Sequence, residues 1–295
     1  MSKSTWGIVP PASNLAPTLA VKYRPCKLSE FWNYPRDPAL RRLVQEMKTN
    51  TLRSVLVFIA PFSGAKTSVA RFMGQWTSCL RWQTDPLPCG ECDMCRTVMY
   101  GQADFRDGFY EINAATDWAE ETIWEAINMF GYSTVKVNAS LFTRQTDNPR
   151  PHIIFVDEVQ RLPPRVQDKF LKPVEKMYSG IFVLATDDKS KVDGGLLSRG
   201  HPPYCFTHPT PEEAAPHLVR IARSEGFELS VDLALMLGKA GQGIPRNCLN
   251  LLQSTFAVTI ERNDKQISRD DIMEICGDEV KLKPDQIDVT EEEIG

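Results

Sequence analysis

Four short apolar segments, separated by stretches long enough to form helices, constrain the fold of this chain most. They are residues 54–60 (SVLVFIA), 109–113 (FYEIN), 152–157 (HIIFVD) and 181–186 (IFVLAT). Runs that are apolar throughout, rather than at alternate positions, indicate strands buried on both faces. Because strands that alternate with helices form parallel sheets, we predict an α/β fold for residues 20–208, with helices on both faces of a parallel sheet.

The character of the sequence changes at Thr210. Thr210, Pro211 and Glu213 supply an N-cap, a proline at the first helical position and the glutamate of a capping box. Further helix starts fall near residue 230, at Pro245 and at Ser268, and no strand pattern follows residue 208. We therefore predict a small all-α domain at residues 209–277.

The two ends of the chain differ in composition from the rest. Residues 1–19 are rich in Pro, Ser, Thr and Ala and predict a flexible arm, while residues 278–295 hold seven acidic residues against two lysines and predict a disordered tail. No apolar run approaches the roughly 20 residues that span a membrane, and no apolar signal region follows the first residues. We expect a cytoplasmic protein without membrane contact.

Four cysteines lie close together: Cys79, Cys89, Cys92 and Cys95. Two residues separate each of the last three, a spacing that lets two thiolates bind one metal ion, and Zn²⁺ favours four sulfur ligands. Because thiols stay reduced in the cytoplasm, the cluster favours metal binding over disulfides. We predict a zinc module at residues 79–95.

The loop after the first apolar segment, Ala60–Thr67, reads APFSGAKT and is similar to the phosphate loop G-x-x-x-x-G-K-[ST]. Lys66 and Thr67 match the residues that meet the β- and γ-phosphate oxygens and Mg²⁺. Ala60 and Ala65 replace both glycines, and a Cβ in a left-handed conformation costs roughly 1–2 kcal/mol per residue. That cost would weaken nucleotide binding, and the loop by itself fits a strand–loop–helix connection without nucleotide equally well.

Two acids, Asp157 and Glu158, end the third apolar segment. In company with the phosphate loop, Asp157 can hold Mg²⁺ through water and Glu158 can act on the attacking water as general base. Two acids after a buried strand also fit a solvated turn. Thr186 ends the fourth segment, where a polar side chain could touch the γ-phosphate, and Arg199 by itself fits a surface residue.

Taken in order, these features resemble the bacterial DNA polymerase III clamp-loader subunits gamma/tau, which are AAA+ ATPases. The resemblance covers about residues 18–277. Besides the phosphate loop and the four cysteines, the motifs that carry it are VKYRP at 21–25 with Phe31, EINAAT at 111–116, DEVQ at 157–160, FLKPVE at 170–175, LAT at 184–186, LSR at 197–199 and GIPRN at 243–247. The family's C-terminal collar domain has no counterpart here, so we expect a divergent form.

The resemblance implies an AAA+ domain with an inserted zinc module, a helical lid, and ATP with Mg²⁺ as ligands. It assigns ATP binding to Tyr23, Arg24, Pro25, Ala60, Pro61, Phe62, Ser63, Gly64, Ala65, Lys66, Thr67 and Ser68. Thr67 and Asp157 would bind Mg²⁺, and Lys66 and Glu158 would act in catalysis. The four-cysteine zinc site would be structural, because a closed set of ligands leaves no place for water.

Three arginine and threonine positions take further roles from the same resemblance. Thr186 and Arg246 look like the two nucleotide sensors, which also bind the nucleotide. Arg199 looks like an arginine finger that acts on the ATP of a neighbouring subunit. Such a finger works only in an oligomer. The implied partners are other clamp-loader subunits, in a homo- or hetero-oligomer, a sliding clamp and primed DNA.

The chain also departs from the family's pattern. Gln160 stands where the family has histidine, and residues 117–121 (DWAEE) are acidic where the family often carries basic, DNA-facing residues. Arg161, Arg165, Lys169 and Lys172 could supply DNA phosphate contacts instead, or form a solvated helix face.

Three functions are compatible with these features. The preferred hypothesis is a clamp-loader-type ATPase subunit acting in DNA replication. The second is a non-hydrolysing structural subunit like the family's delta-prime subunits, which keeps Arg199 for a neighbour. The third is a zinc-stabilised adaptor that uses the fold only for protein contacts.

Overall fold

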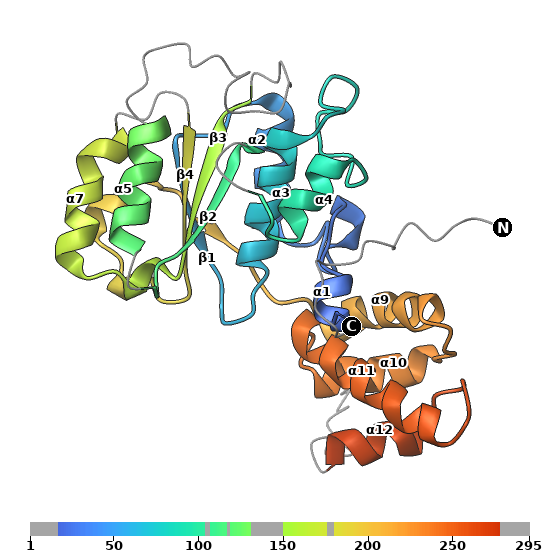
Figure 1. Ribbon diagram of the computed structural model, residues 1–295. Helices are drawn as coiled ribbons and strands as arrows, with labels where there is room; N and C mark the ends of the chain where they lie inside the picture. The colour runs from blue at the N-terminus through green and yellow to red at the C-terminus, as the bar shows by residue number, and fades with distance from the viewer. Residues whose placement is uncertain (1–16, 104–106, 117–118, 131–149, 176–179, 278–295) are drawn as a thin grey trace, which may run out of the picture. The chain divides into compact units, whose positions relative to one another are not determined.

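The computed structural model describes residues 17–103, 107–116, 119–130, 150–175 and 180–277. The chain divides into two compact units between Pro209 and Thr210 (Figure 1). The larger unit is a layered α/β domain and the smaller unit is helical, so both classes of structure predicted from the sequence are present. The acidic tail, most of the N-terminal arm and the first two residues of the acidic loop lie outside the described residues.

A five-stranded parallel sheet forms the centre of the larger unit. Its strands are β1 (Val55–Ile59), β2 (Phe109–Asn113), β3 (His152–Asp157), β4 (Gly180–Thr186) and β5 (Tyr204–Cys205), in the order β2-β3-β4-β1-β5. The four apolar segments form β1 to β4, as predicted. The strand pattern missed β5, which has two residues and directly follows two prolines.

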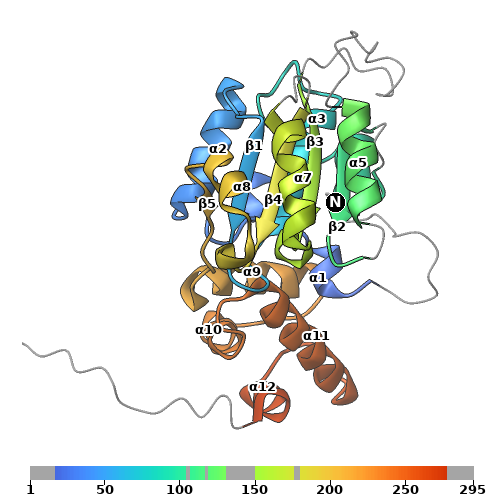
Figure 2. The ribbon, with the colours of Figure 1, turned by 90° about the vertical axis from the view of Figure 1, so that its left-hand side faces the viewer.

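Helices cover both faces of the sheet (Figures 1 and 2). One side carries α2 (Pro38–Thr49), α3 (Lys66–Ser78) and α4 (Asp93–Met99), and the other carries α5 (Ala119–Phe130), α7 (Pro164–Glu175) and α8 (Gly194–Arg199). Short helical turns connect them: α1 (Leu19–Lys22), η1 (Leu28–Glu30), η3 (Val159–Arg161) and η4 (Lys189–Lys191). This arrangement confirms the predicted fold class.

The side chains of each strand alternate between two hydrophobic cores. Leu56 and Phe58 of β1 belong to the core under α2 and α3, while Val57 belongs to the core under α5, α7 and α8. All three are fully buried, as are Phe155 and Ile154 on β3. Each such side chain contributes about 1.5–3 kcal/mol. Burial on both faces is the reason why these strands are apolar throughout.

The smaller unit consists, within the described residues, of α9 (Pro211–Ser224), α10 (Val231–Ala240), α11 (Pro245–Glu261) and α12 (Arg269–Cys276). The hydroxyl groups of Thr210, Ser230 and Ser268 accept hydrogen bonds from the first turns of α9, α10 and α12. An N-cap of this kind is worth about 1 kcal/mol. No helix in the described part of the chain is long and apolar enough to cross a bilayer.

The strand register gathers polar residues at one edge of the sheet. Ile59 lies beside Thr186, and Asn113 lies beside Asp157. The loops that follow β1, β3 and β4 therefore leave from the same carboxyl edge. In open parallel sheets, this edge is where ligands bind.

Candidate nucleotide site and metal centre

The phosphate loop links β1 to α3 and encloses its own lysine. Lys66 is 9% exposed, and its Nζ donates hydrogen bonds to the carbonyl oxygens of Ala60 (2.9 Å) and Pro61 (3.3 Å). The loop closes through a hydrogen bond of 2.9 Å from the Gly64 amide to the Pro61 carbonyl. A Cβ at Gly64 would lie 2.7 Å from that carbonyl oxygen, so the turn requires glycine here.

The two alanines that replace the motif's glycines differ in backbone conformation. Ala65 has φ 50° and ψ −3°, in the left-handed region, where its Cβ carries a cost of roughly 1–2 kcal/mol. Ser63 lies in the same region, with φ 59°. Ala60 does not, and its side chain packs in the core at 2% exposure. The expectation of a left-handed cost at Ala60 is therefore wrong, whereas the expectation at Ala65 is confirmed.

Thr67 and Asp157, far apart in sequence, meet at the carboxyl edge of the sheet. The Thr67 hydroxyl donates a hydrogen bond of 2.7 Å to Asp157 Oδ2. Neighbouring oxygens in the octahedral shell of Mg²⁺ are about 3 Å apart, given metal–oxygen distances of about 2.1 Å. The pair thus offers the oxygen donors that Mg²⁺ prefers, and it fits the ion that the sequence predicts, with Asp157 acting through water.

Burial and charge act in opposite directions on the ionisable groups of this site. Burial lowers the pKa of Lys66, and the charges of Asp157, Asp187 and Glu158 raise it. Burial raises the pKa of Asp157, and the hydrogen bond from Thr67 lowers it. Three carboxylates act on one ammonium group here, so this edge of the sheet favours a further cation. A bound polyphosphate would bring such a cation with it.

Glu158 follows Asp157 in a left-handed conformation, with φ 57°, and opens the turn η3. Its Oε2 lies 3.4 Å from Gln160 Nε2 and 3.5 Å from Arg161 Nε. Gln160 Nε2 also donates a hydrogen bond of 2.7 Å to Asp187 Oδ1. The amide of Gln160 therefore joins the turn after β3 to the end of β4.

Thr186 ends β4 and is fully buried. Its hydroxyl accepts a hydrogen bond of 3.0 Å from the Asp188 amide, and its carbonyl accepts one of 3.3 Å from the Ala60 amide. The predicted sensor is thus fixed directly beside the phosphate loop. Its hydroxyl helps to shape the turn that carries Asp187.

Arg199 ends α8, and its side chain is 27% exposed. Its Nη1 donates a hydrogen bond of 2.8 Å to the Gly195 carbonyl, and its Nη2 forms an ion pair with Glu175. Asp193 caps the helix by accepting from the amides of Gly195 and Leu196. In the described residues, these two partners of the predicted finger lie on α8 and α7 rather than in the phosphate loop of its own chain.

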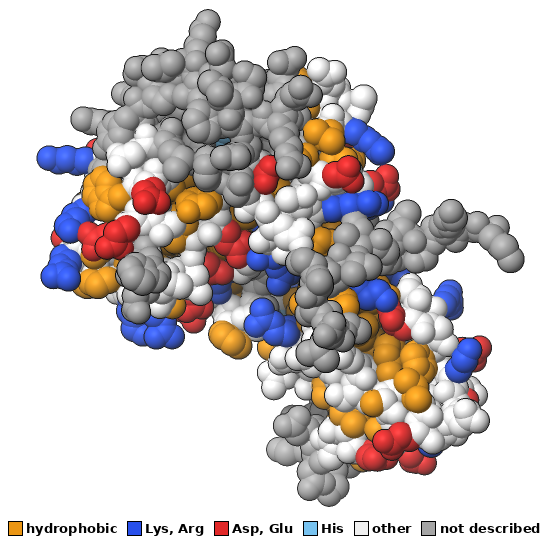
Figure 3. Space-filling view, viewed as in Figure 1, with side chains coloured by type: hydrophobic (Ala, Val, Ile, Leu, Met, Phe, Trp, Pro, Cys, Tyr) orange, Lys and Arg blue, Asp and Glu red, His pale blue; other side chains and the backbone are white. Residues whose placement is uncertain are grey.

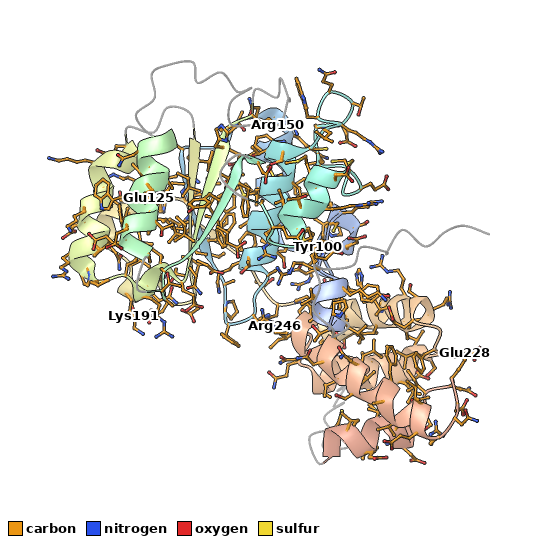
Figure 4. All side chains as sticks on the ribbon, in the orientation of Figure 1. Tyr100, Glu125, Arg150, Lys191, Glu228 and Arg246 are labelled. Atoms are coloured by element: carbon orange, nitrogen blue, oxygen red, sulfur yellow. The ribbon has the colours of Figure 1, made fainter. Side chains whose placement is uncertain are left out.

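The nucleotide-binding residues predicted near the two ends of the described chain differ in how exposed they are. Tyr23 is buried, at 7% exposure, while Arg24 and Pro25 are half-buried. Arg246 is exposed in the first turn of α11, in the helical unit (Figure 4). A cation there gains nothing from its own helix, because the helix dipole is positive at this end.

Two further polar residues of this unit were not found by sequence reasoning. Burial and the charge of Lys66 both lower the pKa of His208. Asp37 is fully buried and accepts hydrogen bonds from Asn33, Leu40 and the backbone and hydroxyl of Thr207. The available signal for Asp37 was its position as N-cap before Pro38.

The four predicted cysteines come together in one cluster. The Sγ atoms of Cys79, Cys89, Cys92 and Cys95 all lie within 4.8 Å of one another, and Cys89 Sγ lies 3.9 Å from Cys95 Sγ. A tetrahedron with metal–sulfur distances of about 2.3 Å has edges of about 3.8 Å, so the set fits one metal ion.

Backbone amides donate hydrogen bonds to two of these sulfur atoms. Cys79 Sγ accepts from the amides of Arg81 and Cys89, each at 3.4 Å. Cys89 Sγ accepts from the amides of Glu91 (3.5 Å) and Cys92 (3.4 Å). Such donors orient thiolate ligands and stabilise their charge.

The cysteine module is fastened to the sheet unit by charged side chains. Arg150, labelled in Figure 4, donates to the carbonyl oxygens of Trp76 (2.7 Å), at the end of α3, and Pro86 (3.2 Å), in the module's loop. Lys27 forms an ion pair of 2.6 Å with Glu91. These contacts tie the module to the helix that begins at the phosphate loop.

The basic side chains predicted as DNA contacts lie on or near α7. Arg165 and Lys172 are exposed, while Lys169 pairs with Glu120 of α5 at 2.7 Å, and Arg161 pairs with Glu158. In the view of Figure 3, basic and acidic side chains are mixed over the side formed by α5 and α7. The solvated-face interpretation therefore fits Lys169 and Arg161.

Comparisons with known proteins bear on this fold and site. No protein-family model matches the chain. The DNA polymerase III subunit tau/gamma of Haemophilus influenzae is 26% identical over 264 residues, covering 88% of this chain and 34% of that relative. The replication factor C small subunit of Halobacterium salinarum is 25% identical over 170 residues, covering 57% of this chain and 49% of that relative.

Among solved structures, the RuvB Holliday junction branch migration motor of Thermotoga maritima superposes with a TM-score of 0.59. It is 16% identical and the match covers 86% of this chain and 72% of that one, so it concerns the fold alone. The fold is that of the AAA+ proteins. Together with the sequence relatives, it supports a divergent clamp-loader-like AAA+ protein, an ATPase-type chain related to the gamma/tau and replication factor C subunits.

Proposed function

We propose that this protein is a clamp-loader-type AAA+ subunit that couples ATP binding and hydrolysis to the loading of a sliding clamp on primed DNA. The observation that carries the proposal is the 2.7 Å hydrogen bond between Thr67 and Asp157, next to a lysine enclosed by the phosphate loop. The clamp and the DNA are proposed as partners because the relatives are named as replication subunits.

We assign each group of this site a step. Lys66 exchanges the carbonyl oxygens of Ala60 and Pro61 for phosphate oxygens when ATP binds. Thr67 and Asp157 would hold Mg²⁺, an ion that would supply positive charge against the phosphates. Glu158 takes a proton from the attacking water. The backbone amides of Phe62, Ser63 and Ala65 add donors for the phosphates, whereas Pro61 has no amide hydrogen and the Gly64 amide bonds to the Pro61 carbonyl.

Hydrolysis then depends on a neighbouring subunit. Arg199 leaves Glu175 and meets the γ-phosphate held by the neighbour, where it stabilises the charge on the transferred group. Thr186 and Arg246 sense the nucleotide of their own chain, with Tyr23, Arg24 and Pro25 near its adenine. Subunits of this kind assemble into a homo- or hetero-oligomer.

The metal of the cysteine cluster is proposed to be zinc with a structural role. Four thiolates close the coordination shell and leave no position for water, so the ion takes no part in hydrolysis. Free thiols in this number fit a reducing compartment, and we place the protein in the cytoplasm.

One observation favours a second candidate function. Ala65 holds a left-handed conformation at a position where the motif has glycine, and its Cβ stands at the start of the helix that receives the phosphates. A non-hydrolysing structural subunit that donates Arg199 to a neighbour would tolerate this change.

Binding of a fluorescent ATP analogue to the wild-type chain and to Lys66→Ala tests the nucleotide site. We expect Lys66→Ala to weaken binding at least about tenfold, since it removes a charge-assisted contact. Clamp association and clamp loading on primed DNA, measured with and without ATP, test the partners. Equal binding by the two variants, with no clamp association, would support an adaptor instead.

A further inference from the structure

We propose that Gln160 positions the attacking water for ATP hydrolysis, and that Asp187 sets the orientation of its amide. This inference rests on the proposed role of Glu158 as general base. It assigns a function to the position at which the chain has glutamine rather than the family's histidine. The argument comes from the hydrogen bonds at the carboxyl ends of β3 and β4.

The orientation of the Gln160 amide follows from its partner. The carboxylate of Asp187 can only accept hydrogen bonds, so the group that lies 2.7 Å from Asp187 Oδ1 is the Nε2 of Gln160. The same nitrogen lies 3.4 Å from Glu158 Oε2. One amide thus bridges the carboxylate after β4 and the carboxylate after β3.

This orientation leaves the Gln160 carbonyl oxygen as an acceptor with no donor. Oε1 is buried and has no hydrogen-bond partner in the described part of the chain. Buried polar atoms are nearly always satisfied, by protein or by ordered water. The oxygen is enclosed in the structure without nucleotide, and a water admitted between Oε1 and the carboxylate of Glu158 when ATP binds would satisfy it.

A water held in this way is arranged for reaction. It donates one hydrogen to Gln160 Oε1 and the other to Glu158, which leaves a lone pair to attack phosphorus. Glu158 receives the proton as the new bond to phosphorus forms, and the bond to the leaving diphosphate breaks. A nucleophile, a base beside it and a third group that orients them form a recurring catalytic arrangement.

Gln160→Leu keeps the size of the side chain and removes both polar atoms. We expect kcat for ATP hydrolysis to fall by about 10- to 100-fold, below the 10²–10⁴-fold attributed to a general base. The Kd for ATP should stay within about twofold, because the hydrogen bonds of Gln160 in the described residues go to Glu158 and Asp187 rather than to the phosphate loop. Gln160→His, with one donor and one acceptor in a neutral ring, should retain more activity than Gln160→Leu.

Asp187→Asn and Lys191→Ala serve as a matched pair. An amide at position 187 accepts both orientations of the Gln160 amide, which should lower kcat about twofold by halving the competent population. Lys191 is 66% exposed and pairs with Asp188, the neighbour of Asp187, at 3.1 Å, so Lys191→Ala should leave kcat unchanged. Circular dichroism and thermal melts of each variant check the fold.

The outcomes separate this inference from the proposed function. Loss of hydrolysis in Glu158→Gln with full activity in Gln160→Leu would overturn the role of Gln160 alone. A fall in ATP affinity as large as the fall in kcat would also overturn it, since that is the effect of a structural residue. A wild-type chain that binds ATP without hydrolysing it under any condition would overturn both.

Discussion

The cysteine module and the phosphate site differ in how the groups that would bind their ligands are held. In the module, backbone amides donate hydrogen bonds to the sulfurs of Cys79 and Cys89. Arg150 donates to the carbonyl oxygens of Trp76, at the end of α3, and of Pro86, in the module's loop. In the phosphate site, Ser63 Oγ and Gln160 Oε1 are buried without a hydrogen-bond partner in the described residues.

Backbone conformation shows the same difference. Ser63, Ala65 and Glu158 all hold left-handed conformations around the phosphate site, whereas in the module the left-handed position belongs to a glycine, Gly90. Strained backbone conformations persist where the surrounding structure holds them, and they are common at ligand sites. The comparison therefore separates a region built for stability from a region built for binding.

The largest expected effect comes from the module. Cys92→Ser removes one thiolate, so the metal content should fall from about one ion per chain to near zero. The unfolding temperature should fall by roughly 5–10 °C, as expected for a loss of about 2–3 kcal/mol in a domain of this size. Metal analysis and calorimetry measure both quantities.

Cys205→Ser is the matched control, because Cys205 is exposed and lies outside the cluster. It should change neither metal content nor unfolding temperature. If Cys92→Ser keeps its metal, the cluster is not the binding site. If it loses the metal and ATP hydrolysis fails while the chain stays folded, the module is not merely structural.

A second pair of variants tests the strain assigned to the phosphate loop. Ala65→Gly should raise the free energy of unfolding by about 1 kcal/mol, because glycine holds a left-handed conformation without the Cβ penalty. Ala60→Gly should lower it by a similar amount, since Ala60 is buried outside that region and glycine loses more chain entropy on folding. Urea unfolding followed by tryptophan fluorescence measures both. Shifts of the same sign would contradict the assignment.

The smallest effect concerns the finger. Glu175→Gln keeps an acceptor oxygen but removes the charge that pairs with Arg199, and a half-exposed pair is worth at most about 1 kcal/mol. Turnover by the assembled oligomer should therefore rise, by less than about fivefold. Arg199→Ala in the same assay should lower turnover strongly. A large fall in Glu175→Gln would place Glu175 within the catalytic arrangement.

Much of this fold follows from the sequence because the central strands are buried on both faces. Their apolar runs mark β1 to β4 and also place Thr67 and Asp157 at one edge, since parallel strands end together. β5 was not predicted, because a strand of two residues after two prolines is too short to show a strand pattern in the sequence.

The remaining features depend on three-dimensional details that no pattern carries. The bridge from Gln160 to Asp187 depends on strand register and side-chain direction, and the ion pair of Arg199 with Glu175 depends on the packing of α7 against α8. The different conformations of Ala60 and Ala65 depend on how the loop folds around Lys66. The sequence identified Gln160, Arg199, Ala60 and Ala65, but their partners Asp187 and Glu175 required the structure.

The most direct test of the central claim is ATP turnover by the wild-type chain and by Glu158→Gln, measured with Mg²⁺, a sliding clamp and primed DNA. Wild-type protein should hydrolyse ATP, and Glu158→Gln should hydrolyse it about 10²- to 10⁴-fold more slowly. ATP binding by the variant should be retained. Equal turnover by the two proteins, or no ATP binding by the wild-type chain, would contradict the account.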